Sequence, residues 1–297
     1  MISIVIPTYN RVSLLQECMQ SIFSQYYEGL EVIVIDDQST DGTKLYLHEL
    51  NQYDFIKIIY NKENGGVNYS RNRGIEAATG KFILFLDSDD ALVPQSLCRI
   101  KKIIEENRGT THFLFVVSDR ADSIRNVTGV KYIAYQDWIN ESISGDFTHV
   151  VLAYTMKKYL FFESFRMFEH LNWLRVKKET SPQLLIPVVT TQRQRGRSDS
   201  LTISGKLTDV SIIKSKFESQ KLYYSLYYTD LNLYNPGSLT YKLIETILLG
   251  VACNQKKECR GLLHYAGKWY IKIAGHMAIL LPPFLVEYAI TRYSGLK

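Results

Sequence analysis

Short apolar segments rich in β-branched residues alternate with helical segments over the first 90 residues of the chain. The pattern predicts strands at residues 3–7, 31–35, 55–60 and 81–86, with helical segments between them. Strands that alternate with helices assemble into an open parallel sheet through right-handed crossovers. The sequence therefore predicts an α/β fold with a mostly parallel sheet flanked by helices.

The composition is that of a globular protein with a large core. The chain has 297 residues, 46% hydrophobic and 22% charged, which excludes a disordered, collagen-like or multi-span membrane protein. Its four cysteines show no metal-binding spacing, so we expect reduced thiols. Residues 1–110 carry 11 Lys/Arg and 15 Asp/Glu, a net charge of −4, whereas residues 111–297 carry 24 and 15, a net charge of +9. This asymmetry favours a bound cation or charged ligand early in the chain, then a surface attracted to phosphates or anionic lipid.

Polar residues follow three of the predicted strands at their carboxyl ends, where ligands bind in open α/β sheets. These segments are Pro7-Thr8-Tyr9-Asn10, Asp36-Asp37 and Asp87-Ser88-Asp89. Asp87 and Asp89 offer hard oxygen ligands suited to Mg²⁺ or Mn²⁺; the alternative is an acidic turn that caps the next helix. Two acidic clusters at neighbouring strand ends repel each other unless a cation or ligand compensates, which favours a ligand site.

Other polar residues of this region suit a nucleotide. Tyr9 can stack on a base, while Thr8 and Arg11 can bind a ribose or a phosphate, although a turn before a helix explains the same segment. The glycine pair at 65–66 and the arginine-bearing segment 70–74 supply flexible backbone and positive charge, or only a loop.

Together these motifs resemble family 2 glycosyltransferases. The matching segments, in the family's order, are IVIPTYN at 4–10, VIDDQSTDGT at 34–43, NGG at 64–66, SRNRG at 70–74 and FLDSDD at 85–90. The resemblance implies a GT-A fold at residues 1–205, with a Rossmann-like nucleotide-binding half at 1–95 and an acceptor half at 96–205. We expect a mainly helical C-terminal extension at 206–297.

The resemblance also implies roles for single positions. Contacts with the nucleotide sugar are implied for Pro7, Thr8, Tyr9, Arg11, Asp36, Asp37, Arg71, Asp87 and Ser88. Asp89, with Asp87, is implied to hold a divalent metal, Mn²⁺ or Mg²⁺. The implied reaction is an inverting displacement, in which an acceptor hydroxyl is deprotonated by a side-chain base and attacks the anomeric carbon as the nucleoside diphosphate leaves.

The position of the base departs from the family pattern. The family has a Glu-Asp pair before an apolar helix that ends in arginine, and the matching segment here is FEHLNWLR at 168–175. His170 takes the place of the aspartate, and an imidazole with an ordinary pKa of about 6.5 can accept a proton near neutral pH. Glu169 is the other candidate for the base, and the alternative is that both residues only begin an amphipathic helix.

Two further basic segments suggest contacts with anions. In the run at 193–200, Arg193, Arg195 and Arg197 can bind phosphate oxygens of the donor, unless the run is solvated surface. In the tail, basic residues flank apolar ones at Lys256, Lys257, Arg260, Lys268 and Lys272. This pattern suits peripheral contact with an anionic membrane, and the packing of a helical lobe or a homodimer contact explains it equally.

The sequence therefore predicts a glycosyltransferase that moves a sugar from a nucleotide donor, expected to be UDP-linked, to a glycan or lipid-linked glycan of a surface polysaccharide or lipopolysaccharide. We expect a cytoplasmic location, with peripheral attachment to the inner face of the cell membrane as an option, and no nucleic-acid partner. One alternative is a catalytically silent homologue that binds the nucleotide sugar or glycan. The other is a nucleotidyltransferase, which is expected to carry a Gly-rich phosphate loop after the first strand, unlike the segment at 7–10.

Overall fold

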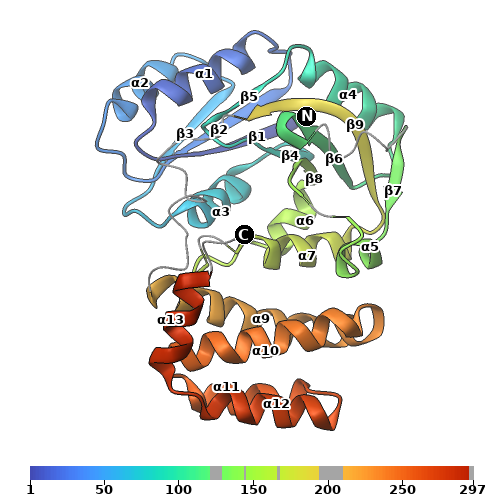
Figure 1. Cartoon of the computed structure of the whole chain (residues 1–297). Helices are drawn as coiled ribbons and strands as arrows, with labels where there is room; N and C mark the ends of the chain where they lie inside the picture. The colour runs from blue at the N-terminus through green and yellow to red at the C-terminus, as the bar shows by residue number, and fades with distance from the viewer. Residues whose placement is uncertain (121–128, 144, 166–167, 194–209, 294–297) are drawn as a thin grey trace. The chain divides into compact units, whose positions relative to one another are not determined.

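The computed structural model describes residues 1–120, 129–143, 145–165, 168–193 and 210–293 (Figure 1). Their contacts divide the chain into two units: Met1–Tyr135 with Ile143–Arg195, and Gln136–Ser142 with Gly196–Lys297. The predicted boundary at residue 205 lies outside the described residues, so the domain limits stay a prediction.

The first unit is built on a nine-stranded sheet. Its strands are β1 (Ile2–Thr8), β2 (Leu30–Asp36), β3 (Ile56–Tyr60), β4 (Phe82–Phe85), β5 (Asp90–Leu92), β6 (His112–Val117), β7 (Lys131–Ile133), β8 (Phe147–Leu152) and β9 (Gln183–Arg193). Along the sheet the order is β3-β2-β1-β4-β8-β6-β9-β5, and β7 pairs with β9. The first four strands of this order are parallel. Beyond them only β6 and β9 are parallel, because β8 runs against both of its neighbours and β5 and β7 run against β9. The α/β class is confirmed, with a mixed sheet.

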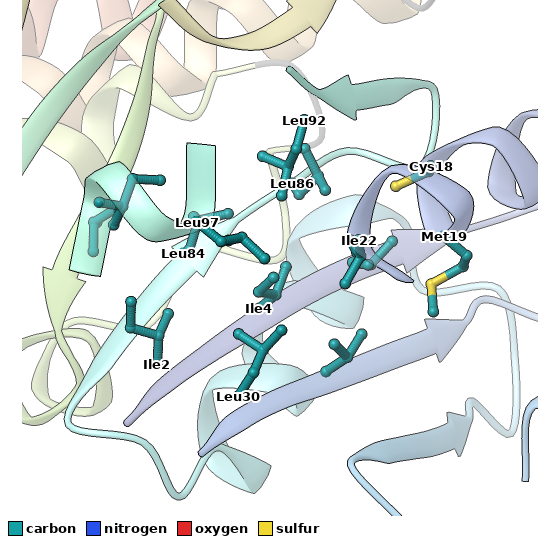
Figure 2. Close-up of a cluster of buried hydrophobic side chains, with 14 of the residues drawn as sticks. Ile2, Ile4, Cys18, Met19, Ile22, Leu30, Leu84, Leu86, Leu92 and Leu97 are labelled. Carbon is teal, nitrogen blue, oxygen red and sulfur yellow. The ribbon is translucent and has the colours of Figure 1, made fainter. Parts of the chain in front are cut away.

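Helices cover both faces of this sheet (Figure 1). They are α1 (Val12–Phe23), α2 (Thr43–Leu50), α3 (Val67–Ala77), α4 (Ser96–Glu106), α6 (Ala153–Lys158) and α7 (His170–Glu179), with a short 3₁₀ helix at Ser118–Arg120. Side chains alternate along β1 because successive strand residues point to opposite faces. Ile4 therefore joins the cluster with Met19 of α1 (Figure 2), whereas Val5 packs on the other face with Ile75 of α3.

Helix α3 lies very close to the sheet at Gly74. A Cβ atom at this position would lie 2.8 Å from Cδ1 of Ile35 and closer still to the branched side chain of Val5. Only a glycine therefore allows this separation between α3 and strands β1 and β2.

The second unit is helical, which confirms the predicted C-terminal helical region. Its helices are α5 (Tyr135–Ile139), whose first residue belongs to the first unit, α9 (Val210–Tyr234), α10 (Pro236–Ala252), α11 (Lys256–Leu262), α12 (Trp269–Leu280) and α13 (Pro283–Tyr293), with a 3₁₀ turn at Leu263–Tyr265. Phe217 and Tyr224 of α9 are buried with Ile247 of α10. The N-terminus of α10 is capped by Asn235, whose side chain accepts a hydrogen bond from the Ser238 N–H at 3.2 Å.

Candidate active site

The carboxyl ends of β1, β2 and β4 meet at one edge of the parallel part of the sheet. Thr8 of β1 lies opposite Asp36 of β2, and β4 ends two residues before Asp87. In open α/β sheets, ligands bind at the carboxyl ends of the strands, at the point where the strand order reverses. Here β1 lies between β2 and β4, so the structure places these polar ends at such a point.

Asp37 organises the loop before helix α3. Its Oδ1 accepts hydrogen bonds from Asn61 Nδ2 at 2.8 Å and from the Gly65 N–H at 2.9 Å, and its Oδ2 accepts one from the Gly66 N–H at 2.8 Å. Gly66 has a φ of 87°, a left-handed conformation that glycine adopts at little cost. The Asp37 carboxylate is therefore buried, and its hydrogen bonds come from its own chain. Through them it holds the loop from which α3, the helix that carries Arg71, begins.

The loops after β1 and β2 are tied to each other. Asn10 donates its N–H to Ser39 Oγ at 2.8 Å, and its Oδ1 accepts the Thr40 N–H at 2.7 Å. Asp36 is fully buried, and both of its carboxylate oxygens lie within 3.3 Å of the Ser39 N–H. Tyr9 precedes Asn10 in this loop, and its side chain is exposed. Its ring is therefore accessible for stacking.

The remaining predicted site residues differ in solvent exposure and in their partners. Pro7 is buried within β1, opposite Ile35, and Ser88 and the Thr8 hydroxyl are buried too. Arg11 forms an ion pair with Asp89, with 2.6 Å between Nη1 and Oδ2. Arg195 and Arg197 lie outside the described residues.

Arg71 joins the strand end to the segment that carries the candidate base. This buried guanidinium lies 2.7 Å from Asp87 Oδ1 through Nη2 and 2.5 Å from Glu169 Oε1 through Nη1. Burial opposes ionisation of Asp87, but the neighbouring Arg71 outweighs it and lowers the pKa of that carboxyl. Burial likewise opposes the charge on Arg71, and Glu169 and Asp87 together raise its pKa. Residues that are 98 positions apart in the sequence, Arg71 and Glu169, thus share one charged cluster.

This cluster opens into a pocket of about 310 Å³. Five residues selected from the sequence line it: Arg71, Asp87, Glu169, His170 and Arg193. His170 begins helix α7 and is exposed. The other selected residues of the described part do not line this pocket; Asp90, the residue after Asp89, does.

One wall of the pocket is lined by β8 and helix α7, and we call it the α7 wall. Its internal contacts were not predicted from the sequence. His149 of β8 stacks on Trp173 of α7, with 3.8 Å between ring centroids and 13° between ring planes. His149 Nδ1 also lies 2.8 Å from His112 Nε2, and Thr180 Oγ1 lies 2.9 Å from His112 Nδ1. Burial lowers the pKa of both imidazoles well below its usual value, so both rings are neutral at pH 7. These contacts fix α7 against the sheet and so position Glu169 and His170.

Two basic side chains, half-buried Arg193 and buried Lys177, complete the lining. Arg193, at the end of β9, lies 2.9 Å from Asp146 Oδ2 through Nη1 and 3.7 Å from Asp90 Oδ2 through Nε. Lys177 follows Trp173 by one turn of α7, and burial lowers its pKa to about 7. Both follow from signals visible in the sequence: Lys177 keeps the helical spacing from His170 and Trp173, and Arg193 begins the basic run at 193–200.

The strand-end carboxylates fit a divalent ion only if the substrate supplies further ligands. Burial, with repulsion from Asp87 and Asp89, raises the pKa of Asp90 to about 8 despite the neighbouring Arg193, which marks an excess of negative charge here. In the part of the chain that the structure describes, no three side chains of the metal-binding types form a cluster. Two carboxylates fit a Mg²⁺ or Mn²⁺ ion that takes its remaining oxygens from phosphates and water.

Comparisons with known proteins agree with this architecture. The model of glycosyl transferase family 2 matches residues 3–158, more than half of the chain. A GalNAc(5)-diNAcBac-PP-undecaprenol beta-1,3-glucosyltransferase of Campylobacter jejuni is 30% identical over 189 residues, which cover 61% of this chain and 60% of the relative. A poly(ribitol-phosphate) beta-glucosyltransferase of Bacillus spizizenii is 39% identical over 111 residues, 36% of this chain and 18% of the relative. The chain thus spans less than two thirds of the length of these relatives.

Solved structures share the fold at low sequence identity. S. aureus TarS 1-349 in complex with UDP-GlcNAc has a TM-score of 0.60 at 14% identity, with 99% of this chain and 91% of that chain covered. The mannosyltransferase PcManGT of Pyrobaculum calidifontis, in complex with GDP-Man and Mn²⁺, has a TM-score of 0.56 at 15% identity, with 99% and 84% covered. These structures support the GT-A architecture, and the family model that spans most of the sheet supplies the assignment: this chain belongs to glycosyl transferase family 2.

Proposed function

We propose that the chain transfers a sugar, with inversion, from a UDP-linked donor to a hydroxyl of a glycan or lipid-linked glycan. The observation that carries this proposal is the Arg71 bridge, which joins Asp87 at the strand end to Glu169, next to His170, in one pocket. The Campylobacter relative is named for a lipid-linked glycan, and a TarS structure contains UDP-GlcNAc; both support the proposed substrate classes. Membership of the family favours glycosyl transfer over nucleotidyl transfer.

The donor would lie along the edge formed by β1, β2 and β4. Exposed Tyr9 would stack on the base, while the loop organised by Asp37 shapes the base and ribose site. Arg193 faces Asp90 and Asp146 in the pocket and would provide positive charge for the diphosphate. Arg195 and Arg197, a few residues further along, are proposed to add to it.

Asp89 and Asp87 are the residues that would hold a divalent ion. When bound, this ion would stabilise the charge that develops on the leaving diphosphate. Because Arg11 pairs with Asp89 at 2.6 Å, Arg11 would have to give up part of this contact when the donor and ion bind.

His170 is the proposed base. Glu169 is held 2.5 Å from the buried Arg71, so its carboxylate is already engaged in an ion pair. His170 lines the same pocket and stands at the position of the family's aspartate. The acceptor's O–H proton would pass to the imidazole as its oxygen bonds to the anomeric carbon. The bond from that carbon to the diphosphate breaks on the opposite side, and its electron pair leaves with the phosphate oxygen.

A catalytically silent, donor-binding homologue is the second candidate. It is favoured by one observation, namely that histidine stands at the position of the family's aspartate while Glu169 is engaged by Arg71. Such a protein would bind the nucleotide sugar through the same strand ends and release no nucleoside diphosphate.

One experiment separates these functions. Binding and nucleoside diphosphate release are measured for a panel of UDP- and GDP-sugars, each with Mn²⁺ and with EDTA, in the presence and absence of glycan acceptors. We expect Mn²⁺-dependent release of UDP from one donor, which would also identify the sugar. Tight binding without release would support the silent homologue, and failure to bind any donor would contradict both.

A further inference from the structure

We propose that the second unit carries a docking surface for an anionic lipid bilayer on helices α12 and α13. We define the apolar outer face by the exposed large hydrophobic residues of these helices and their connection. They are Trp269, Tyr270, Ile273, Met277, Leu280, Leu281, Phe284, Leu285 and Tyr288. Single exposed apolar residues are common on protein surfaces, but nine of them on two successive helices and their connection indicate an interaction surface.

Helix α12 is apolar on two opposite sides. Its inner side packs on α10 and the 3₁₀ turn through Ile271, Gly275 and Ile279; a Cβ at Gly275 would lie 3.1 Å from Ile247 Cδ1. Its outer side carries Trp269 and Leu280 at 74% and 79% exposure, with the apolar residues between them spaced by three or four positions. The outer side is both apolar and exposed, although Lys272 and His276 lie on the same helix, so it suits a partner with an apolar surface.

The geometry of the two helices favours lying in a membrane surface over crossing a membrane. Within the described ranges no single helix is long and apolar enough to span a bilayer, but α12 and α13 reach that composition together and are bent by 99°. Each is only 11 or 12 residues long, about 18 Å at most, which is shorter than a hydrocarbon core of about 30 Å. Two short helices at a right angle can instead both rest their outer sides in the interface.

The positive charge around this surface favours an anionic lipid over a second copy of the chain as its binding partner. Residues 256–292 contain six Lys/Arg and two Glu, a net charge of +4, and one of these acids, Glu258, is already paired with Lys221. Lys268 Nζ lies 5.7 Å from the ring centroid of Tyr270 and Arg292 Cζ lies 5.6 Å from that of Tyr288, so cations accompany aromatic rings on both helices. Like charges repel across a symmetric dimer contact, whereas aromatic and basic residues together suit anionic headgroups.

Flotation with vesicles tests the proposal on the full chain without donor or acceptor. We expect binding to vesicles that contain about one third phosphatidylglycerol and little binding to phosphatidylcholine alone, with binding reduced by salt. The triple variant Met277→Gln/Leu280→Gln/Phe284→Ser should lower binding to anionic vesicles at least about tenfold. The double variant Lys268→Gln/Lys272→Gln should lower it by about fivefold for each lysine and leave the weak binding to neutral vesicles unchanged.

The control is Leu45→Gln/Tyr154→Ser, which removes two comparably exposed apolar side chains from the first unit and should bind like wild type. Thermal unfolding of every variant checks its fold, and sedimentation records its oligomeric state. Failure of the wild-type protein to bind anionic vesicles would overturn the proposal. So would a triple variant that floats normally but dissociates from a dimer, since this would assign the surface to a second copy. Because no donor is present, either result leaves the proposed sugar transfer standing.

Discussion

The strand-end edge and the α7 wall of the site hold their polar groups in different ways. At the edge, Asp36 accepts hydrogen bonds from the Ser39 N–H of its own loop, and Asp37 accepts them from the Gly65 and Gly66 N–H groups of the loop before α3. At the wall, Glu169 is held by the Arg71 side chain and His149 by a stacked Trp173. Backbone donors keep their place when neighbouring side chains change, whereas a side-chain network depends on each of its members. We therefore expect Asp36 and Asp37 to be less sensitive to substitution of their neighbours than Glu169 and His149.

Loss of Asp89 at the edge is expected to have the largest effect. Asp89→Ala removes a carboxylate proposed to hold the divalent ion, so Mn²⁺-dependent UDP release should be abolished with the thermal unfolding midpoint unchanged. EDTA should do the same to wild type. Asp54→Ala, at an exposed position, is the control, and full activity of Asp89→Ala would remove the metal role.

Substitution of His170 tests the chemistry of the wall. His170→Ala should lower kcat by about 10²–10⁴-fold, the usual contribution of a general base, with little change in donor affinity. His48→Ala, another exposed histidine, should have no effect. If Glu169→Gln shows the large loss of kcat while His170→Ala does not, the proton acceptor is Glu169.

Arg71 connects the edge with the wall, and its removal should damage both. Arg71→Met leaves Asp87 and Glu169 without their shared partner, and we expect the free energy of unfolding to fall by about 2–3 kcal/mol. This is less than for a fully buried pair, because the two carboxylates are 38% and 32% exposed. Donor binding should also weaken. Urea unfolding and calorimetry measure both effects, with exposed Arg73→Met on the same helix as the control.

Asp37 tests how firmly the edge depends on its loops. Asp37→Ala leaves the N–H groups of Gly65 and Gly66 without their acceptor, and we expect a loss of about 2 kcal/mol in the free energy of unfolding. Donor affinity should fall with it, since the loop begins α3. An Asp37→Ala protein as stable as wild type would show that the loop is held by other contacts.

Lys177 should affect stability rather than catalysis, through a pH dependence. Burial lowers its pKa from 10.5 to about 7, partly opposed by Asp146. Between these values the unfolded chain binds more protons than the folded one, so the free energy of unfolding rises with pH. Lys177→Met removes this dependence, and its stability advantage over wild type should be larger near pH 6 than near pH 9. Urea unfolding at both pH values measures the difference, and a constant difference would contradict the lowered pKa.

The edge could be predicted from the sequence because its signals are local. Apolar strands followed at once by polar residues predict β1 to β4 and place Asp87 beside Thr8 and Asp36. What the sequence did not indicate is how Asp37 is used: its hydrogen bonds to Gly65 and Gly66 depend on a loop whose conformation no short segment determines.

The wall could be predicted only in part because its contacts span long separations. Helix α7 was expected from its pattern, and Glu169 and His170 from their position before it. Strand β8 was missed, and with it His149, because it pairs with β4 and β6, which lie far away in the chain. The turn at β5, which places Asp90 opposite Arg193, is equally non-local.

The close approach at Gly74 restricts how this chain can evolve. Arg71 lies one turn before Gly74 on α3, so the distance between helix and sheet also sets the distance from Arg71 to Asp87. A side chain at position 74 would push the helix outward and draw the guanidinium away from both carboxylates. A saturation library of α3 should therefore accept many residues at the exposed Arg73 and Glu76 and only glycine at 74, so the spacing between this helix and the sheet is fixed by a single position.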